Sequence, residues 1–540
     1  NGVTVHRFKG SGVQGFILAP GLHLECLFTR KTSASSGLIQ NLELNWQLFR
    51  GKRIFNEDLG SLMPYLIEFA YKKNYQIMGF FKRRNNGNTA RRFFPGPGTF
   101  AHGVHPPQRK ELAADAPIEI IPPPEKVILP LQQHIGGPCS PIVKPKQPVA
   151  FGEMIGKGEA FVSASLHAPL AGIVQKMEVT TLANGRHMQA IVIRGEGEQL
   201  CGQALWDELF GGKWPQKSYQ TIDPAKITAA INDAGIVGLG GAAFPTHVKI
   251  MPSDKKPIHT LVVNGCECEP YLTTDYRLMV EAPDAIVAGA LLAARAVGAR
   301  EAYIGIENNK REAVASLRRS AAGAGIKIAV LKTKYPQGSE KHLIKAVLNR
   351  EIPLGGLPSD IGVAMTNVAT VTSVARGVMR GIPLTHRVIS VTGGGIVRPK
   401  NLLVPIGIPM GTLIDYCGGL HKTAARIIAG GPMMGFAFTN PNTPVTKGTS
   451  GITVLTHEEI RRVDQTGCVR CGRCVDVCPM KIVPTRVAMA SRFKDLNLAR
   501  KYNIMACFEC GSCAYVCPAG LPLVQQIRTG KALIAAEGQR

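Results

Sequence analysis

The stretch that decides the fold of the C-terminal region is CVRCGRCVDVCP, from Cys468 to Pro479. A second copy, CFECGSCAYVCP, runs from Cys507 to Pro518. Each copy has the spacing C-x2-C-x2-C-x3-C-P. A [4Fe–4S] cluster needs four thiolates at one site, and a short C-x2-C-x2-C turn supplies three of them from one loop. The two copies therefore predict two [4Fe–4S] clusters.

When two such runs pair, the fourth cysteine of each run binds the cluster of the other. The first predicted ligand set is Cys468, Cys471, Cys474 and Cys517, and the second is Cys478, Cys507, Cys510 and Cys513. Structural zinc sites use two separated ligand pairs, which fits this spacing less well. Disulfides would imply an oxidising compartment, and nothing in the sequence resembles a cleavable signal peptide. We interpret the six remaining cysteines as packing residues.

Composition limits the function classes. The chain has 540 residues, 45% of them hydrophobic, which predicts several globular domains with substantial cores. No uninterrupted apolar run reaches about 18 residues, so we expect no membrane-spanning helix. The formal net charge of +25 favours a membrane surface or acidic protein partners. No nucleic-acid-binding module is recognisable, and we expect no nucleic acid partner.

The N-terminal part changes character at Met78. Residues 1–77 mix apolar runs with basic clusters and show no lasting period, whereas MGFFKRRNN reads as an ordinary basic start. The leading hypothesis is that 1–77 is an upstream extension absent from the working protein, and the alternative is a genuine appendage. Residues 78–126 are basic and then proline-rich, which predicts an extended segment.

Residues 127–200 alternate short β-rich runs with glycine turns, which predicts a small all-β hammerhead, a barrel-sandwich hybrid. The phrase SLHAPLAGIVQKM is similar to the second half of a biotinyl or lipoyl carrier domain. The equivalent stretch here, EAFVSASLHAPLAG, contains no lysine, so we expect the carrier fold without the modified side chain.

Residues 215–384 alternate helical and strand patterns, which predicts a doubly wound α/β domain with a parallel sheet. Its first notable loop is GLGGAAFPTHVK (238–249). Glycines allow a backbone to approach phosphate closely, and Lys249 is a candidate ligand cation. The loop follows a helix and lacks a G-K-S/T ending, so it is neither a Rossmann fingerprint nor a P-loop. A phosphate-cradling loop and a plain helix C-cap both remain open.

The second loop is NGCECEP (264–270), directly after the apolar run HTLVV. Ligands of open α/β sheets bind at the carboxyl ends of the strands, where Asn264, Glu267 and Glu269 would lie. The alternative is a turn with solvated carboxylates. The C-x-C pair in this loop has no second pair and is a poor candidate for metal binding.

Together these two loops resemble the flavin and NADH site of the NADH-binding flavoprotein subunit of respiratory complex I. With GVHPP (103–107), KYPQGSEKHL (334–343), TNVATV (366–371) and the double cysteine run, residues 100–530 resemble the RnfC/RsxC family, which belongs to the Rnf (Rsx) ion-translocating electron-transport complex. The resemblance implies a β-grasp (SLBB) domain at 385–440 and an α-helical two-cluster ferredoxin-type domain at 455–530.

The resemblance also implies the cofactor contacts. FMN would be held by the glycines of the first loop, Lys249, Asn264 and Asn367. Phe244 would stack near the nicotinamide or adenine ring. The two glutamates of NGCECEP would lie by the NADH. The complete set is Gly238, Gly240, Gly241, Phe244, Lys249, Asn264, Glu267, Glu269, Tyr335, Glu340 and Asn367. Two positions depart from the family pattern: Ala243 replaces a usual glycine, and Ser339 replaces the first of two glutamates.

The expected function is electron transfer between NADH, FMN and two [4Fe–4S] clusters, with no catalytic acid, base or nucleophile. Expected partners are the membrane and peripheral subunits of an Rnf-type complex, with an iron–sulfur subunit or ferredoxin as electron acceptor. The expected location is peripheral, on the cytoplasmic face of the bacterial inner membrane. One alternative is a soluble reductase of the cobalamin-reductase type, and the other is a cluster-only carrier with an inactive flavin domain.

Overall fold

The computed structural model describes residues 94–215, 219, 221–251, 255–461 and 463–538, together with the backbone of four strands near the N-terminus. The chain divides into two compact units, residues 1–90 and 91–540. In the first unit, β1 (His6–Gly10), β2 (Val13–Ala19), β3 (Leu22–Phe28) and β4 (Leu42–Leu44) form an antiparallel sheet in that order. The other residues of 1–77, for which we predicted an upstream extension, lie outside the described residues.

The second unit begins with an extended segment that packs on later parts of the chain. The amides of Gly96 and Gly98 donate to the carbonyls of Val347 and Ala346, at 2.7 and 2.9 Å. Its helical content is one short turn, η1 (Lys110–Leu112). The predicted extended character is therefore observed for the described part of this segment.

The next domain is all-β, as predicted, and consists of two small sheets. One has the order β10 (Leu166–His167), β9 (Met154–Gly158), β7 (Cys139–Pro141). The other has the order β12 (Glu178–Thr181), β13 (His187–Gly195), β11 (Gly172–Val174), β8 (Pro148–Val149), with β6 (Lys126–Pro130) also paired to β13. Val127, Ile191 and Ile193 are fully buried between the layers, since apolar side chains of paired strands share one face.

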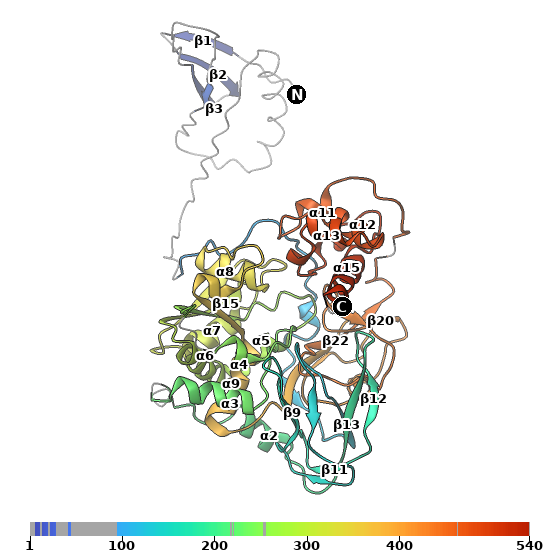
Figure 1. Cartoon of the computed structure of the whole chain (residues 1–540). Helices are drawn as coiled ribbons and strands as arrows, with labels where there is room; N and C mark the ends of the chain where they lie inside the picture. The colour runs from blue at the N-terminus through green and yellow to red at the C-terminus, as the bar shows by residue number, and fades with distance from the viewer. Residues whose placement is uncertain are drawn as a thin grey trace. The chain divides into compact units, whose positions relative to one another are not determined.

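The α/β domain contains a parallel sheet with the order β16 (Ile326–Leu331), β15 (Glu301–Glu307), β14 (Thr260–Asn264), β17 (Val363–Asn367). Leu261 and Val263 pack in the same core as α6 (Pro283–Val297) and α9 (Val368–Arg380), whereas Val262 packs in the core that contains α8 (Glu340–Leu348). Alternating side chains of one strand thus serve two helical layers, which Figure 1 shows on either side of the sheet. The remaining helices are α3 (Pro224–Asp233), α4 (Thr246–Lys249), α5 (Thr274–Glu281) and α7 (Arg311–Ser320).

A six-stranded sheet forms the third domain. Its order is β21 (Phe436–Ala437), β20 (Ala424–Ala429), β22 (Gly451–Thr456), β18 (His386–Thr392), β19 (Lys400–Pro405), β5 (Ile118–Ile120), and α10 (Met410–Tyr416) follows β19. Strands β5 and β22 come from outside the range 385–440. Only the tertiary structure brings them to this sheet, because strands of three and six residues carry no sequence signal that identifies their partners.

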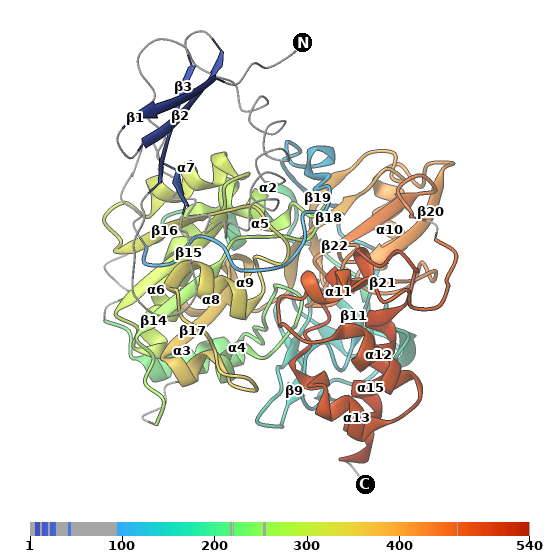
Figure 2. The ribbon, with the colours of Figure 1, turned by 90° about the horizontal axis from the view of Figure 1, so that it is seen from above.

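The last domain is helical, as predicted, with α11 (Arg473–Asp476), α12 (Pro484–Arg492), α13 (Leu496–Lys501), α14 (Ser512–Tyr515) and α15 (Leu523–Glu537). Its core contains the fully buried Val487, Ala499, Ile504 and Ile527. Figures 1 and 2 show this domain beside strands β20 and β22. Within the described part of the chain, no helix is both long and apolar enough to cross a bilayer.

Candidate redox site

The glycine loop lies between α3 and α4. The amide of Gly238 donates to the carbonyl of Phe244 at 2.8 Å and the amide of Ala243 donates to the carbonyl of Gly238 at 3.1 Å, which closes the loop on itself. Gly241 has φ +110° and Ala243 has φ +51°, both in the region that favours glycine. The family departure at Ala243 therefore lies at a position where glycine would carry less backbone strain.

The exposed tip of this loop offers hydrogen-bond donors. Among the described residues, the amides of Gly240, Gly241 and Ala242 have no protein acceptor. The tip sits at the N-terminus of α9, where the amide of Leu239 donates to Thr370 Oγ1 at 2.9 Å. Free amides beside the positive end of a 13-residue helix suit a phosphate or the polar edge of a flavin ring. This donor set fits FMN.

Asn264 and Asn367 end the two neighbouring strands β14 and β17 and are register partners. Asn367 Oδ1 accepts from the amide of Ala369 at 2.9 Å and so caps α9, while its Nδ2 donates to Asp275 Oδ2 at 2.7 Å. Asn264 Nδ2 donates to the carbonyl of Gly338 at 2.8 Å. The structure brings both predicted FMN contacts to the carboxyl edge of the sheet, where their side chains also hold the surrounding loops.

Glu267 caps the N-terminus of α5. Its Oε1 accepts from Thr274 Oγ1 at 2.9 Å and from the amide of Asp275 at 2.7 Å, and its Oε2 accepts from the amide of Tyr276 at 3.2 Å. Burial raises the pKa of Asp275 to about 7, and the nearby charge of Glu267 acts in the same direction. These contacts exclude the alternative of solvated carboxylates for this residue.

Glu269 joins the NGCECEP loop to the third domain. Its carboxylate accepts from the amides of Met433 and Met434, at 3.2 and 2.8 Å. Burial raises the pKa of Glu269 to about 7, against the lowering effect of these amides. Lys110 Nζ donates to the carbonyl of the same residue at 3.0 Å. Glu269 is therefore an interdomain anchor in this structure.

The remaining predicted contacts lie around the loop before α8. Lys249, at the end of α4, forms an ion pair of 2.6 Å with Glu340, and both side chains are about one-third exposed, at 36% and 34%. Ser339 precedes α8, and its Oγ lies 2.5 Å from His342 Nδ1. Phe244 is half-buried at the end of the glycine loop. The structure thus places Lys249 and Glu340 together as one polar pair.

Tyr335 lies between the α/β domain and the second cysteine run. Its side chain is 2% exposed, and its hydroxyl donates to the carbonyl of Cys510 at 2.7 Å. Its backbone pairs with Val104 of the GVHPP segment at 2.8 and 3.0 Å. Two motifs that are distant in sequence therefore meet at the cysteine loop.

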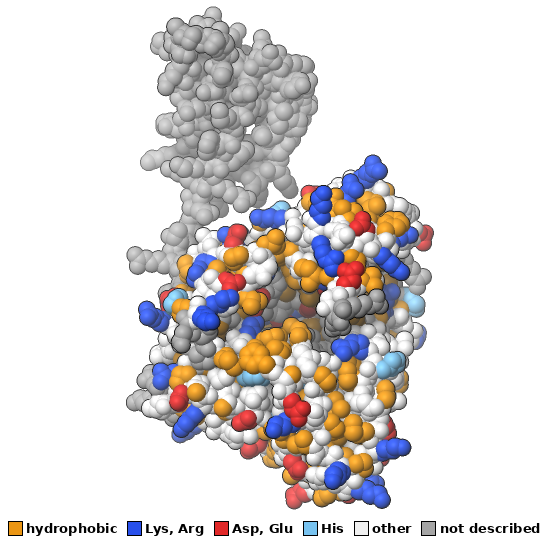
Figure 3. Space-filling model, viewed as in Figure 1, with side chains coloured by type: hydrophobic (Ala, Val, Ile, Leu, Met, Phe, Trp, Pro, Cys, Tyr) orange, Lys and Arg blue, Asp and Glu red, His pale blue; other side chains and the backbone are white. Residues whose placement is uncertain are grey.

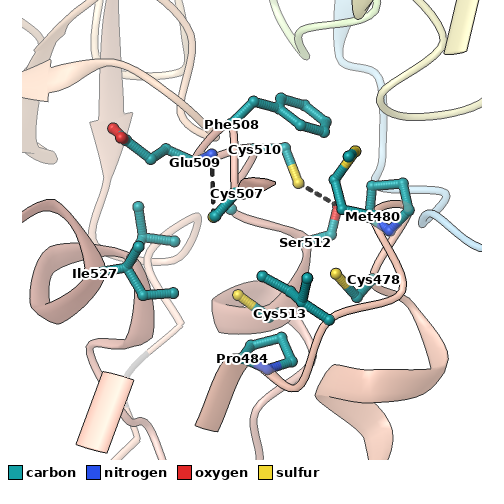
Figure 4. Close-up of a pocket in the computed structure, with 14 residues that line it drawn as sticks. Cys478, Met480, Pro484, Cys507, Phe508, Glu509, Cys510, Ser512, Cys513 and Ile527 are labelled. Atoms are coloured by element: carbon teal, nitrogen blue, oxygen red, sulfur yellow. Dashed lines mark hydrogen bonds between the residues drawn. The ribbon is translucent and has the colours of Figure 1, made fainter. Parts of the chain in front are cut away.

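A pocket in the helical domain collects the second predicted ligand set. Cys478, Cys507, Cys510 and Cys513 all line it, with Phe508 and Met480 at its wall. Figure 4 shows these side chains around the pocket, with Ile527 of α15 on another side. Ser512 Oγ accepts from Cys510 Sγ at 3.4 Å, and the amide of Glu509 donates to Cys507 Sγ at 3.3 Å. Four thiols and an amide directed at sulfur fit an iron–sulfur cluster.

The first ligand set is more open. Cys474 and Cys517 are each 8% exposed, whereas Cys468 and Cys471 are exposed to solvent. The two runs have the same backbone conformation at two matching positions. Positive φ angles occur at Arg470 and Glu509 and again at Gly472 and Gly511. Among the described residues no three ligating side chains are close enough to hold a single metal ion. A four-iron cluster holds its thiolates farther apart than one ion does, so this spacing is compatible with a cluster.

Sequence reasoning missed several residues of the site. Asp275, Met433 and Met434 contact predicted residues, and Arg387 reaches the carbonyl of Leu239 in the glycine loop at 3.3 Å. None of them belongs to a motif, and no local pattern marks them. Figure 3 shows Lys and Arg side chains spread over the visible face rather than gathered in one patch.

Comparison with known proteins assigns all four domains. The matches are an RnfC barrel sandwich hybrid domain at 98–198, a Nuo51 FMN-binding domain at 231–376, an SLBB domain at 388–437 and a 4Fe-4S dicluster domain at 458–521. The chain is 43% identical over 444 residues to the C subunit of the proton-translocating ferredoxin:NAD(+) oxidoreductase complex of Clostridium ljungdahlii, covering 82% of this chain and 95% of that protein.

Two further relatives support the same assignment. The C subunit of the Na(+)-translocating ferredoxin:NAD(+) oxidoreductase complex of Acetobacterium woodii is 41% identical over 445 residues, covering 82% of this chain and 98% of that protein. The C subunit of the ion-translocating oxidoreductase complex of Rhodobacter capsulatus is 42% identical over 442 residues, covering 81% and 83%.

The fold, the free amides of the glycine loop and the paired cysteine runs define an electron-transfer subunit that uses FMN and two [4Fe–4S] clusters. The chain belongs to the RnfC family of ion-translocating oxidoreductase complexes. The predicted family, fold class and cofactors are confirmed.

Proposed function

We propose that this chain is the NADH-binding subunit of an Rnf-type complex, at the cytoplasmic face of the bacterial inner membrane. Electrons pass between NADH, FMN and two [4Fe–4S] clusters, and the partners of this chain in the membrane couple the transfer to ion movement. An iron–sulfur subunit or ferredoxin is the electron acceptor. The match of 98–198 to the RnfC barrel sandwich domain argues against a soluble reductase of the cobalamin-reductase type.

The proposed domain boundaries are 78–126 for a proline-rich segment, 127–200 for the barrel-sandwich domain, 215–384 for the FMN/NADH domain, 385–440 for the SLBB domain and 455–530 for the cluster domain. The proposed cofactor and metal contacts are those predicted above. The free amides of Gly240 to Ala242 supply donors at the exposed tip of the glycine loop. The pair Lys249–Glu340 supplies charged groups between the end of α4 and the start of α8. The bound flavin would accept one hydride, which carries two electrons, and pass these electrons on one at a time, because flavins take part in both two-electron and one-electron transfer.

The observation that carries the proposal is the contact between the α/β domain and the second cysteine run. Tyr335 donates to the carbonyl of Cys510, and His342 Nε2 lies 3.1 Å from the carbonyl of Pro479. Cys268 accepts from the amide of Gly338 at 3.3 Å and packs in the same apolar cluster as Tyr335 and Cys510. The Cys478 ligand set is therefore the proposed first acceptor, and the more exposed Cys468 set faces the partner.

The testing experiment is anaerobic. The purified protein, reconstituted with iron and FMN, is mixed with NADH while the visible spectrum and the EPR spectrum are recorded on one sample. We expect flavin bleaching followed by the signal of reduced clusters. Clusters that dithionite reduces while NADH leaves the flavin oxidised would contradict the proposal and support a cluster-only carrier.

A further inference from the structure

A buried lysine joins three domains behind the glycine loop. Lys447, which lies between β21 and β22, is 1% exposed, and its Nζ donates to the carbonyl of Ser165 in the barrel-sandwich domain at 2.6 Å and to the carbonyl of Gly235 in the α/β domain at 2.7 Å. Its amide donates to Gln133 Oε1 at 2.9 Å. The neighbouring Gly448 is in contact range of the loop, because a Cβ built there would lie 3.3 Å from Ala243 Cβ.

A buried arginine connects this lysine to the loop itself. Arg387, in β18, is 4% exposed and donates through Nη1 to the carbonyl of Lys447 and through Nη2 to the carbonyl of Leu239 at 3.3 Å. The carbonyl and the N–H of one trans peptide point in opposite directions. Because Arg387 bonds the Leu239 carbonyl on the buried side of the loop, the free N–H of Gly240 in the same peptide points toward the exposed side.

The barrel-sandwich domain holds the other end of the loop. The amide of Ile135 donates to the carbonyl of Ala243 at 3.2 Å. By the same geometry, this contact fixes the peptide between Ala243 and Phe244. A domain that resembles a carrier, but whose stretch EAFVSASLHAPLAG has no lysine to modify, thus serves as a support for the glycine loop.

The positive charge of this group is poorly compensated. Within the ranges that the structure describes, neither Lys447 nor Arg387 forms an ion pair with a carboxylate. Asp275 acts on Arg387 only through space. Burial lowers the pKa of Lys447 to about 8, so its ammonium form still dominates near neutral pH. Buried positive charge that is hydrogen-bonded to carbonyls but has no paired carboxylate is costly, and an anion on the far side of the loop would offset part of this cost.

We propose that Arg387 and Lys447 are positioning residues that aim the Gly240 amide and place positive charge behind the glycine loop, so that it selects a phosphate-bearing flavin over an uncharged one. This inference rests on the proposed function, because it assumes that the loop binds flavin. It adds a role for two residues outside the FMN domain, and it assigns the barrel-sandwich domain to the same support.

The test compares FMN with riboflavin, which lacks the phosphate. Full-length protein with its clusters in place is stripped of flavin, and the affinity for each compound is measured by anaerobic calorimetry. In Lys447→Met and in Arg387→Gln we expect the Kd of FMN to rise about tenfold, because one positive charge behind the glycine loop is lost. The Kd of riboflavin should stay unchanged, so the preference for FMN falls.

Two variants serve as controls. Lys422→Met removes an exposed lysine of the same domain and should leave both affinities unchanged. Arg387→Lys keeps the charge and should retain most of the preference for FMN. Iron content and cluster EPR report whether each variant is folded. If Lys447→Met does not fold, the two Arg387 variants decide: an equal preference for FMN in both would overturn the proposal.

A parallel loss of affinity for FMN and riboflavin would also overturn it, since the residues would then support the loop without selecting phosphate. Unchanged affinities in Lys447→Met would do the same. If the unaltered protein binds neither compound, the proposed function fails instead, and the two failures are distinguishable.

Discussion

Single residues control the contact between the α/β domain and the cysteine loop. Replacing Tyr335 by Phe removes the hydrogen bond from its hydroxyl to the carbonyl of Cys510. We expect a loss of about 1 kcal/mol in stability, because the buried carbonyl is left unpaired. The rate of flavin reduction by NADH should be unchanged, while cluster reduction becomes slower. Stopped-flow absorbance at the flavin and cluster wavelengths measures both rates.

The matched control for this prediction is Tyr303→Phe. The Tyr303 hydroxyl lies 3.4 Å from Glu301 Oε1 and 3.4 Å from Lys327 Nζ, and among the described residues no hydrogen bond joins it to the cysteine loop. This variant should leave both rates unchanged. Equal rates of cluster reduction in Tyr335→Phe and in the unaltered protein would show that the hydrogen bond does not set the approach of the two domains.

Glu269 should make stability depend on pH. The pKa of Glu269 is raised from 4.5 to about 7 in the folded protein. Its contribution to the free energy of unfolding is therefore fully present below pH 4.5 and is lost as the pH rises to about 7. The neutral amide in Glu269→Gln avoids this ionisation cost. We expect the variant to gain about 2 kcal/mol relative to the unaltered protein between about pH 5 and pH 8, after allowance for partial exposure. Denaturant unfolding at both pH values measures this gain, and a difference independent of pH would contradict it.

At the scale of elements, we predict that the two cysteine runs, which include the short helices α11 and α14, exchange their fourth ligands. The exchange predicts how double substitutions combine. Cys478→Ala with Cys507→Ala should lose one cluster, because both residues belong to one ligand set. Cys478→Ala with Cys474→Ala should lose both clusters, although these cysteines lie in one run. Iron content and EPR spin counts distinguish the two variants, and the reverse pattern would mean that each run binds its own cluster.

The glycine loop shows how an element depends on its surroundings. Its own sequence leaves both a helix C-cap and a phosphate-cradling loop open. In the structure, the amide of Leu239 donates a hydrogen bond to Thr370 Oγ1 of α9. The carbonyl of Ala243 accepts one from the amide of Ile135 in the barrel-sandwich domain. These contacts leave the tip amides free for a ligand, which favours the phosphate-cradling interpretation.

At the scale of the whole molecule, residues 91–540 form a compact unit of their own. A chain that begins at Met78 should therefore keep its FMN, its clusters and its melting temperature. A chain that begins at Ala101 is the control, because it lacks Phe94, which is buried against α8, and the bonds of Gly96 and Gly98 to that helix. We expect it to lose about 2 kcal/mol or more of stability. Loss of flavin or clusters in the chain from Met78 would contradict the hypothesis that residues 1–77 are an upstream extension absent from the working protein.

The sequence by itself determined the two clusters, the flavin domain and the order of domains. These features are local: eight cysteines lie in two short runs, and the strand and helix patterns repeat within about 15 residues. The pairing of Cys478 with the second run stays a prediction, which the pocket around these four cysteines supports.

Only the tertiary structure decided what the predicted side chains contact. Glu267 caps a helix and Glu269 holds a neighbouring domain, and the predicted position of both beside the NADH stays a prediction. Tyr335 meets Cys510 across 175 residues, and Lys447 meets Ser165 across 282. Contacts at such separations depend on how whole domains pack, and a short motif contains no information about the domain that will cover it.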